Sequence, residues 1–269
     1  MSYNRSDNSG LPISIADICV LLAADNASLM DQIFHRYHLY STPGKGSHKL
    51  NLYLVNDYLG NFKEQINITG GGLTITDKTY QGIIDFNRDV STLYLNNGHA
   101  LTDLEYFLRL VYAYLGFQAG GFLIHSAGVV KDGCSYLFFG PSGSGKSTVA
   151  NLSPQEQVLN DDLIMLLPGK DHWIAHSTPF WNAGRGRDSL PTFAPLAGLY
   201  RLVKDRQNFL EKVSAGEALA DFMASIPVLP GSPKFSAGLF QRCSDLLDLI
   251  PVYRLHFTPD NSFWDVVGL

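Results

Sequence analysis

An apolar run leads directly into a glycine-rich one at Ser135–Thr148, SYLFFGPSGSGKST. The second half fits the pattern G-x-x-x-x-G-K-[ST] of a phosphate-binding loop, which lies between a strand and the start of a helix. Glycines let the backbone curve so that successive N–H groups point at phosphate oxygens, and the following helix adds the positive end of its dipole. The residues expected to bind a nucleotide are Gly140, Ser142, Gly143, Ser144, Gly145, Lys146, Ser147 and Thr148.

Two residues of this loop have distinct expected roles. Lys146 is expected to neutralise the β and γ phosphates, and the Ser147 hydroxyl to hold a magnesium ion. The alternative is a strand-to-helix turn that binds nothing, but the flanking strand and the additional Ser142, Gly143 and Thr148 favour a nucleotide. We therefore expect ATP and Mg²⁺ as cofactors. The chain has no Asn-Lys-x-Asp motif for reading a guanine base, which mildly favours ATP and leaves the choice of base open.

Two adjacent carboxylates, Asp161 and Asp162, follow the loop at the end of another apolar run. A strand that ends there would deliver them beside the phosphate loop. Neighbouring side chains of a regular strand point to opposite sides, so a strand end or a turn is needed to bring both into one site. Together they would supply a magnesium ligand and a general base. The alternative is a surface turn, because Asn and Asp favour turns.

Three further side chains are candidates for the site. His125 lies in an otherwise apolar strand before the loop, where a histidine is either a hydrogen-bonded core residue or a catalytic group. Arg185 and Arg187 lie in a glycine-containing stretch, where two guanidinium groups either clamp a phosphoryl group or anionic substrate or lie in solvent. The other histidines show no metal-ligand spacing, so zinc is not implied.

The chain divides near Gly120 into two parts. Residues 1–119 form a β-rich part, in which short β-type runs between Lys49 and Asn97 predict an antiparallel region, and residues 120–269 carry the loop. Apolar residues spaced by three and four predict a helix over 103–115, capped by Thr102 or Asp103. Strands and helices mixed around a glycine loop predict an α/β fold, mixed α+β over the whole chain. In the second part we expect helices over 195–203, 214–225 and 237–249 and a strand over 252–257.

The composition is that of an ordinary globular protein, with 269 residues, 45% of them apolar, and a net charge of -5. No run of Lys or Arg is present, so nucleic acid is not an expected partner. Three widely spaced cysteines, Cys19, Cys134 and Cys243, predict reduced core residues. Residues 110–130 are long enough to span a bilayer, but glycines and polar residues interrupt them and indicate a buried helix followed by a buried strand. A polar N-terminus without an apolar stretch predicts a cytoplasmic protein with no membrane partner.

The phosphate loop, His125 on a preceding strand and the pair Asp161-Asp162 together resemble the HPr kinase/phosphorylase family. The nucleotide domain of that family is similar to the C-terminal domain of phosphoenolpyruvate carboxykinase. The resemblance implies an active-site histidine at His125, a base at Asp161 and a metal partner at Asp162. It covers roughly residues 120–257 and extends more loosely to the N-terminal part.

The runs at 177–180, 194–202 and 251–255 look like a divergent branch of that family, found with peptide-modification cassettes that include the SynChlorMet cassette. The chain also departs from the HPr kinases proper. The segment between Lys146 and the acidic pair is slightly shorter, and Ser153-Pro154 cuts short the helix after the loop, because the residue before proline avoids the helical region. The later segment near the protein-substrate site is not found. HPr itself is therefore a poor candidate substrate.

The resemblance implies an ATP- and Mg²⁺-dependent kinase for a hydroxyl, favouring a serine of a peptide or protein acceptor. Two alternatives stay open. One is a small-metabolite kinase, since a phosphate loop does not say which group receives the phosphate. The other is a nucleotide-dependent binding module of a peptide-maturation system, in which the nucleotide sets the conformation of the chain. HPr kinases assemble into rings, and a homo-oligomer is an open expectation for this chain.

Overall fold

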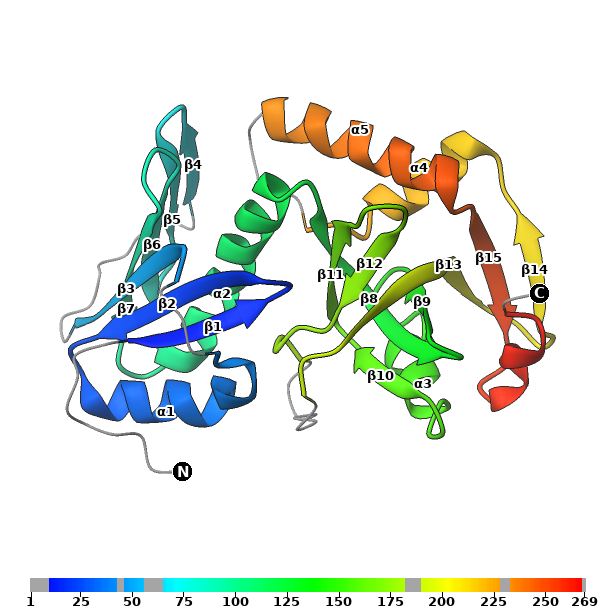
Figure 1. The fold of residues 1–269 in the computed structure, drawn as a ribbon, viewed down its shortest axis with the longest axis horizontal. Helices are drawn as coiled ribbons and strands as arrows, with labels where there is room; N and C mark the ends of the chain where they lie inside the picture. Colours follow the sequence, from blue (N-terminus) through cyan, green and yellow to red (C-terminus); the bar gives the residue numbers. More distant parts are fainter. Residues whose placement is uncertain (1–9, 43–45, 56–64, 182–189, 228–232, 268–269) are drawn as a thin grey trace. The chain divides into compact units, whose positions relative to one another are not determined.

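The computed structural model describes residues 10–42, 46–55, 65–181, 190–227 and 233–267. In these residues the chain is mixed α+β with two multi-stranded sheets (Figure 1). The chain forms two compact units, a first unit over Met1–Tyr112 and a second unit over Ala113–Leu269. The division falls inside helix α2, Ala100–Gln118, whereas the expected boundary at residues 119 and 120 comes just after this helix. No helix in the described ranges is both long and apolar enough to cross a membrane.

The first unit contains a seven-stranded sheet in the order β1-β2-β3-β7-β6-β5-β4. β3 pairs in parallel with β2 on one side and with β7 on the other, and the other neighbouring strands are antiparallel. The antiparallel region expected between Lys49 and Asn97 is confirmed for β4, β5, β6 and β7 and is wrong for β3, which pairs with β7 in parallel. Helix α1 makes the crossover between the parallel strands β2 and β3. The bounds are β1 Leu11–Ile15, β2 Ile18–Ala24, α1 Ala27–Tyr37, η1 His38–Tyr40, β3 His48–Val55, β4 Gln65–Thr69, β5 Gly72–Thr76, β6 Tyr80–Asp85 and β7 Val90–Asn96.

Helix α2 buries the apolar face that its sequence predicts. Leu104, Phe107, Leu108 and Val111 are each at most 1% exposed. The predicted cap at Thr102 or Asp103 is wrong, because the helix begins at Ala100 and Asp103 lies in its first turn. The backbone N–H of Asp103 already donates to the carbonyl of His99, at 3.0 Å.

The second unit contains an eight-stranded sheet in the order β10-β8-β11-β12-β13-β15-β14, with β9 paired to both β8 and β13. β8 pairs with β11 along its first half and with β9 and β10 along its second. β9, β13 and β15 run parallel, so their carboxyl ends meet at one edge of the sheet. The bounds are β8 Phe122–Lys131, β9 Cys134–Phe139, α3 Lys146–Asn151, β10 Gln157–Asn160, β11 Leu163–Pro168, β12 Trp173–His176, β13 Phe193–Lys204, β14 Phe209–Lys212, α4 Ala215–Met223, α5 Pro233–Leu249, β15 Val252–Phe257 and η2 Asn261–Asp265.

The helix expected over residues 195–203 is wrong: this segment is strand β13. β13 pairs with β9, β12 and β15 and is buried over much of its length. A strand buried on both faces reads as a continuous apolar run, which periodicity alone does not distinguish from a buried helix. The other expected elements of this part are confirmed, since α4 and α5 fall within the predicted helical segments or extend them and β15 has the predicted bounds.

Two layers of helix cover the sheet of the second unit (Figure 1). Helices α4 and α5 bury Phe222 and Cys243 against the face that contains Ile124 and Phe139. Helix α3 buries Val149 and Ala150 against the opposite face, with Ala127, Val129 and Phe138. Helix α3 ends at Asn151, as the Ser153-Pro154 pair predicts. The cysteines are all free, but only Cys243 is a buried core residue, so the core placement of Cys19 and Cys134 is wrong.

Candidate functional site

The phosphate-binding pattern forms a loop between the end of β9 and the start of α3. Gly140, Gly143 and Gly145 have φ angles of 145°, 76° and 113°, a region that L side chains rarely adopt. A Cβ on Gly145 would lie 2.5 Å from the ring of Phe257, whereas one on Gly143 would meet open space. Gly145 is therefore required both by its backbone angle and by the aromatic ring packed against it.

The polar groups of the remaining loop residues differ in their burial. Ser142 is exposed, whereas the Ser144 hydroxyl is buried and has no hydrogen-bond partner in the described part of the chain. Ser147 and Thr148 are half-buried in the first turn of α3. This arrangement leaves hydroxyl groups and the first backbone N–H groups of α3 around one turn, which is the donor set that a phosphate requires.

The ammonium group of Lys146 is folded onto its own loop. Its Nζ donates to the carbonyl oxygens of Gly140 and Pro141, at 2.9 and 3.3 Å. Lys146 is buried, and this burial lowers the pKa of its ammonium group, while the negative charge of Asp162 acts in the opposite direction. A buried ammonium group held by neutral carbonyls can be stabilised further by an anion, and the loop is the place where a phosphate would bring one.

The acidic pair lies at a break between two strands. β10 ends at Asn160 and β11 begins at Leu163, and both strands pair with β8. Asp161 and Asp162 are 3% and 5% exposed, so the surface turn considered as an alternative is wrong. The backbone carbonyl of Asp162 accepts a hydrogen bond of 3.0 Å from the N–H of Ser126, which fixes this corner on β8.

His125 contacts the second of the two carboxylates. Its Nε2 lies 2.9 Å from Oδ1 of Asp162, and the side chains are 44% and 7% exposed. Residues alternate along β8, with Ile124 on the α4 and α5 side and Ala127 and Val129 on the α3 side, so His125 points to the α3 side as well. A side chain exposed to this extent is not a core histidine, so the core alternative is wrong.

His125 and Asp162 are thus in contact, and the negative charge of Asp162 acts on the ammonium group of Lys146. Asp161 is buried next to Asp162 at the same strand end. His125 pairs with Asp162, the carboxylate expected at the metal, and not with Asp161, the expected base. Arg185 and Arg187 lie outside the described residues.

Ser147 and Asp162 are suitable for the expected magnesium ion. Magnesium prefers oxygen ligands, is commonly held by one or two protein groups and takes phosphate oxygens and waters for the rest. A hydroxyl and a carboxylate supply ligands of this kind. In the described ranges no three His, Cys, Asp or Glu side chains gather into a metal-binding group, and a magnesium ion that is shared with a nucleotide does not need such a group.

Sequence reasoning missed a set of charged side chains beside the loop. Arg201 of β13 is in register with Phe139, the last residue before the loop, and with Arg254 of β15. The Nε of Arg201 lies 3.0 Å from Oδ1 of Asp221 in α4, and Nη2 of Arg254 lies 3.1 Å from Oδ2 of the same carboxylate. This network ties α4 to two strands that end at the edge where the loop begins. The sequence signal was a single arginine within each of two apolar runs, and such an arginine does not indicate which residue it pairs with.

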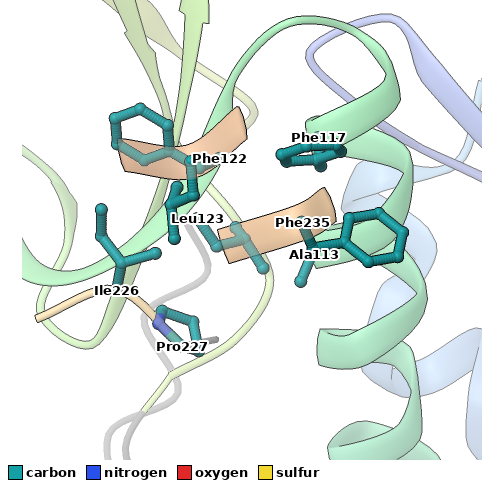
Figure 2. Close-up of a pocket in the computed structure, with 8 residues that line it drawn as sticks. Ala113, Phe117, Phe122, Leu123, Ile226, Pro227 and Phe235 are labelled. Atoms are coloured by element: carbon teal, nitrogen blue, oxygen red, sulfur yellow. The ribbon is translucent and has the colours of Figure 1, made fainter. Parts of the chain in front are cut away.

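The second unit also contains a pocket lined by apolar side chains. Phe117, Phe122, Ile226 and Phe235 line it together with other apolar side chains (Figure 2). The rings of Phe117 and Phe235 meet edge to face with centroids 4.8 Å apart. Since no charged or hydrogen-bonding side chain lines this hollow, it offers no group for phosphate chemistry, and the candidate site is the loop with its histidine and carboxylates.

No protein-family model matches this chain, and no curated protein matches it. The chemistry of the site must therefore come from its own groups: backbone N–H donors, a buried ammonium group, a histidine and two buried carboxylates. These groups are the ones that phosphoryl transfer uses for charge neutralisation and for proton acceptance.

Proposed function

We propose that this chain is an ATP- and Mg²⁺-dependent phosphotransferase that acts on a hydroxyl group, a serine of a peptide or protein. The observation that carries the proposal is the 2.9 Å contact of His125 with the buried Asp162, in a unit whose phosphate-binding loop also contains the buried Lys146. Residues 120–269 would form a nucleotide domain of the HPr kinase and phosphoenolpyruvate carboxykinase type. The resemblance in the sequence and the order of loop and acidic corner along the chain support this family.

Catalysis in such a site consists mainly of positioning and charge neutralisation. The loop N–H groups and Lys146 bind the phosphates, and Ser147 and Asp162 hold the magnesium ion, which supplies further neutralisation of the phosphate charge. The acceptor oxygen attacks the γ-phosphorus as the bond to the β-γ bridging oxygen breaks and ADP leaves. Asp161 takes the proton of the acceptor hydroxyl, and His125 holds the neighbouring Asp162 through its 2.9 Å contact.

The proposal is tested by transfer from γ-labelled ATP. The purified chain is incubated with Mg²⁺, labelled ATP and serine-containing peptides, each paired with the same peptide carrying alanine, and in parallel with small alcohols and sugars. Label on the serine peptide alone is the expected result. Label on a small acceptor would replace the protein kinase with a metabolite kinase, and tight nucleotide binding with no transfer to any acceptor would favour a nucleotide-dependent binding module.

Asp162→Asn should separate metal binding from nucleotide binding. We expect this variant to bind ATP in EDTA as the wild type does and to lose most of the strengthening that Mg²⁺ provides, because an amide oxygen is a weaker magnesium ligand than a carboxylate. Calorimetric titrations with and without Mg²⁺ measure both quantities. An Asp162→Asn protein in which Mg²⁺ strengthens ATP binding as much as in the wild type would remove Asp162 from the metal site.

A further inference from the structure

Asn160 holds the backbone of the acidic corner from inside the protein. Its side-chain Oδ1 accepts hydrogen bonds from the N–H groups of Asp162 and Leu163, at 2.6 and 3.1 Å. Asn160 is fully buried, and both of these N–H groups belong to buried residues. Buried backbone donors require a partner, and here a side chain supplies it in place of a neighbouring strand.

Thr178, eighteen positions further along the chain, fixes this asparagine. The Nδ2 of Asn160 donates to the carbonyl and the Oγ1 of Thr178, at 2.8 and 3.3 Å. The hydroxyl of Thr178 donates in turn to the carbonyl of Leu163, at 2.7 Å. Thr178 is also fully buried. The two side chains therefore form a closed set of hydrogen bonds on both sides of Asp161 and Asp162, which we name the corner clamp.

The corner clamp interrupts the strand at the acidic pair. A continuous strand from β10 into β11 would point Asp161 and Asp162 to opposite sides of the sheet. The hydrogen bonds of Asn160 stop the strand at this residue and turn the next two residues, as Asn side chains do when they bond to the backbone two residues on. The N–H of Asp162 is held by Asn160 and its carbonyl by Ser126, so the backbone that carries this side chain is fixed on both sides. From this backbone the Oδ1 of Asp162 reaches to 2.9 Å from the Nε2 of His125.

We propose that Asn160 and Thr178 are positioning residues for phosphoryl transfer, which set the carboxylates of the acidic corner against His125 and the phosphate loop. This inference rests on the proposed function. Neither side chain needs to touch the nucleotide or the acceptor. Their effect would pass through Asp161 and Asp162, and displacement of a reacting group by about 1 Å can lower a rate by about 100-fold.

The test is a pair of substitutions at Thr178 with a matched threonine elsewhere. Thr178→Val keeps the shape of the side chain and removes the hydroxyl, whereas Thr178→Ser keeps the hydroxyl. Thr42→Val is the control, because the Oγ1 of Thr42 also donates a hydrogen bond, to the hydroxyl of Ser14, but at an exposed position in the first unit. Each protein is assayed for ATP affinity in EDTA, for the gain in affinity with Mg²⁺ and for kcat of transfer to the serine peptide.

We expect Thr178→Val to lower kcat at least about 10-fold and to reduce the Mg²⁺ gain, with ATP affinity in EDTA within about twofold of the wild type. Thr178→Ser and Thr42→Val should stay within about threefold in kcat. A merely structural role would instead lower all three quantities together. Thr178→Val with wild-type kcat and Mg²⁺ gain would overturn the clamp while leaving the kinase intact. A wild-type chain that binds no nucleotide would overturn the proposed function and the clamp with it.

Discussion

Asp161→Asn is expected to abolish most phosphoryl transfer while leaving ATP binding unchanged. The asparagine keeps the size of the side chain but cannot take the proton of the acceptor hydroxyl. General-base catalysis contributes about 10²–10⁴ to a rate, so kcat should fall by a factor in this range. The measurement is transfer from γ-labelled ATP to the serine peptide, with the ATP dissociation constant determined by calorimetry on the same preparation.

Asp171→Asn is the matched control, because Asp171 is exposed in the turn between β11 and β12. It should transfer phosphate at the wild-type rate. If Asp161→Asn is as active as the control, Asp161 is not the base. If Asp161→Asn is active and Asp162→Asn alone is inactive, the two carboxylates have the reverse of the proposed roles.

Gly145→Ala is expected to weaken ATP binding by about 100-fold or more. A residue other than glycine at the φ of 113° costs on the order of 1–3 kcal/mol. The added Cβ would in addition lie 2.5 Å from the ring of Phe257, so the loop or the ring must move. Both effects disturb the N–H groups that the loop presents to the phosphates. Fluorescence or calorimetric titration with ATP measures the change.

Gly133→Ala is the control for placing alanine at a positive φ outside the loop and without a steric clash. Gly133 also has a positive φ, 79°, in the turn between β8 and β9, but a Cβ there meets nothing within 4 Å. We expect this variant to lose some stability and to keep wild-type ATP affinity. A Gly145→Ala protein that binds ATP as tightly as Gly133→Ala would show that the conformation of the loop at Gly145 is not required for the nucleotide.

Much of the second unit could be predicted from local signals. The glycine pattern marked the loop, the Ser153-Pro154 pair marked the early end of α3, and the apolar spacing marked α4. The Ser214 hydroxyl and the Glu217 side chain form a capping box at the start of α4, which stops the helix from beginning earlier. Signals of this kind act over a few residues, so the sequence contains them in readable form.

The errors concern features that depend on distant partners. Residues 195–203 form strand β13 because three strands from other parts of the chain pair with it and two layers of helix cover it. The parallel pairing of β2 with β3 depends on the crossover through α1, and that of β3 with β7 on the three strands between them in the chain, neither of which the individual strand runs encode. Local spacing carries no information about such pairings.

The candidate site shows the same division. His125, Lys146, Asp161 and Asp162 could be named from the sequence because each belongs to a recognisable pattern. Their pairing could not, since the contact of His125 with Asp162 depends on the register of β8 against β11. The contribution of Asn160 was hidden for a similar reason, because its partner Thr178 is eighteen positions away, beyond β11 and β12 in the chain.

The most direct test of the central claim is calorimetric titration of ATP with Mg²⁺ into the wild-type chain and into Lys146→Ala. Lys146 is the only side chain of the loop that brings a full positive charge to the phosphates. We expect the wild type to bind Mg²⁺-ATP with one site per chain, and Lys146→Ala to show binding that is lost or at least about 100-fold weaker, since removing one partner of a buried, hydrogen-bonded charge pair costs about 2–5 kcal/mol. Equal affinity in the two proteins, or no binding to the wild type, would contradict the assignment of this loop as a working nucleotide site.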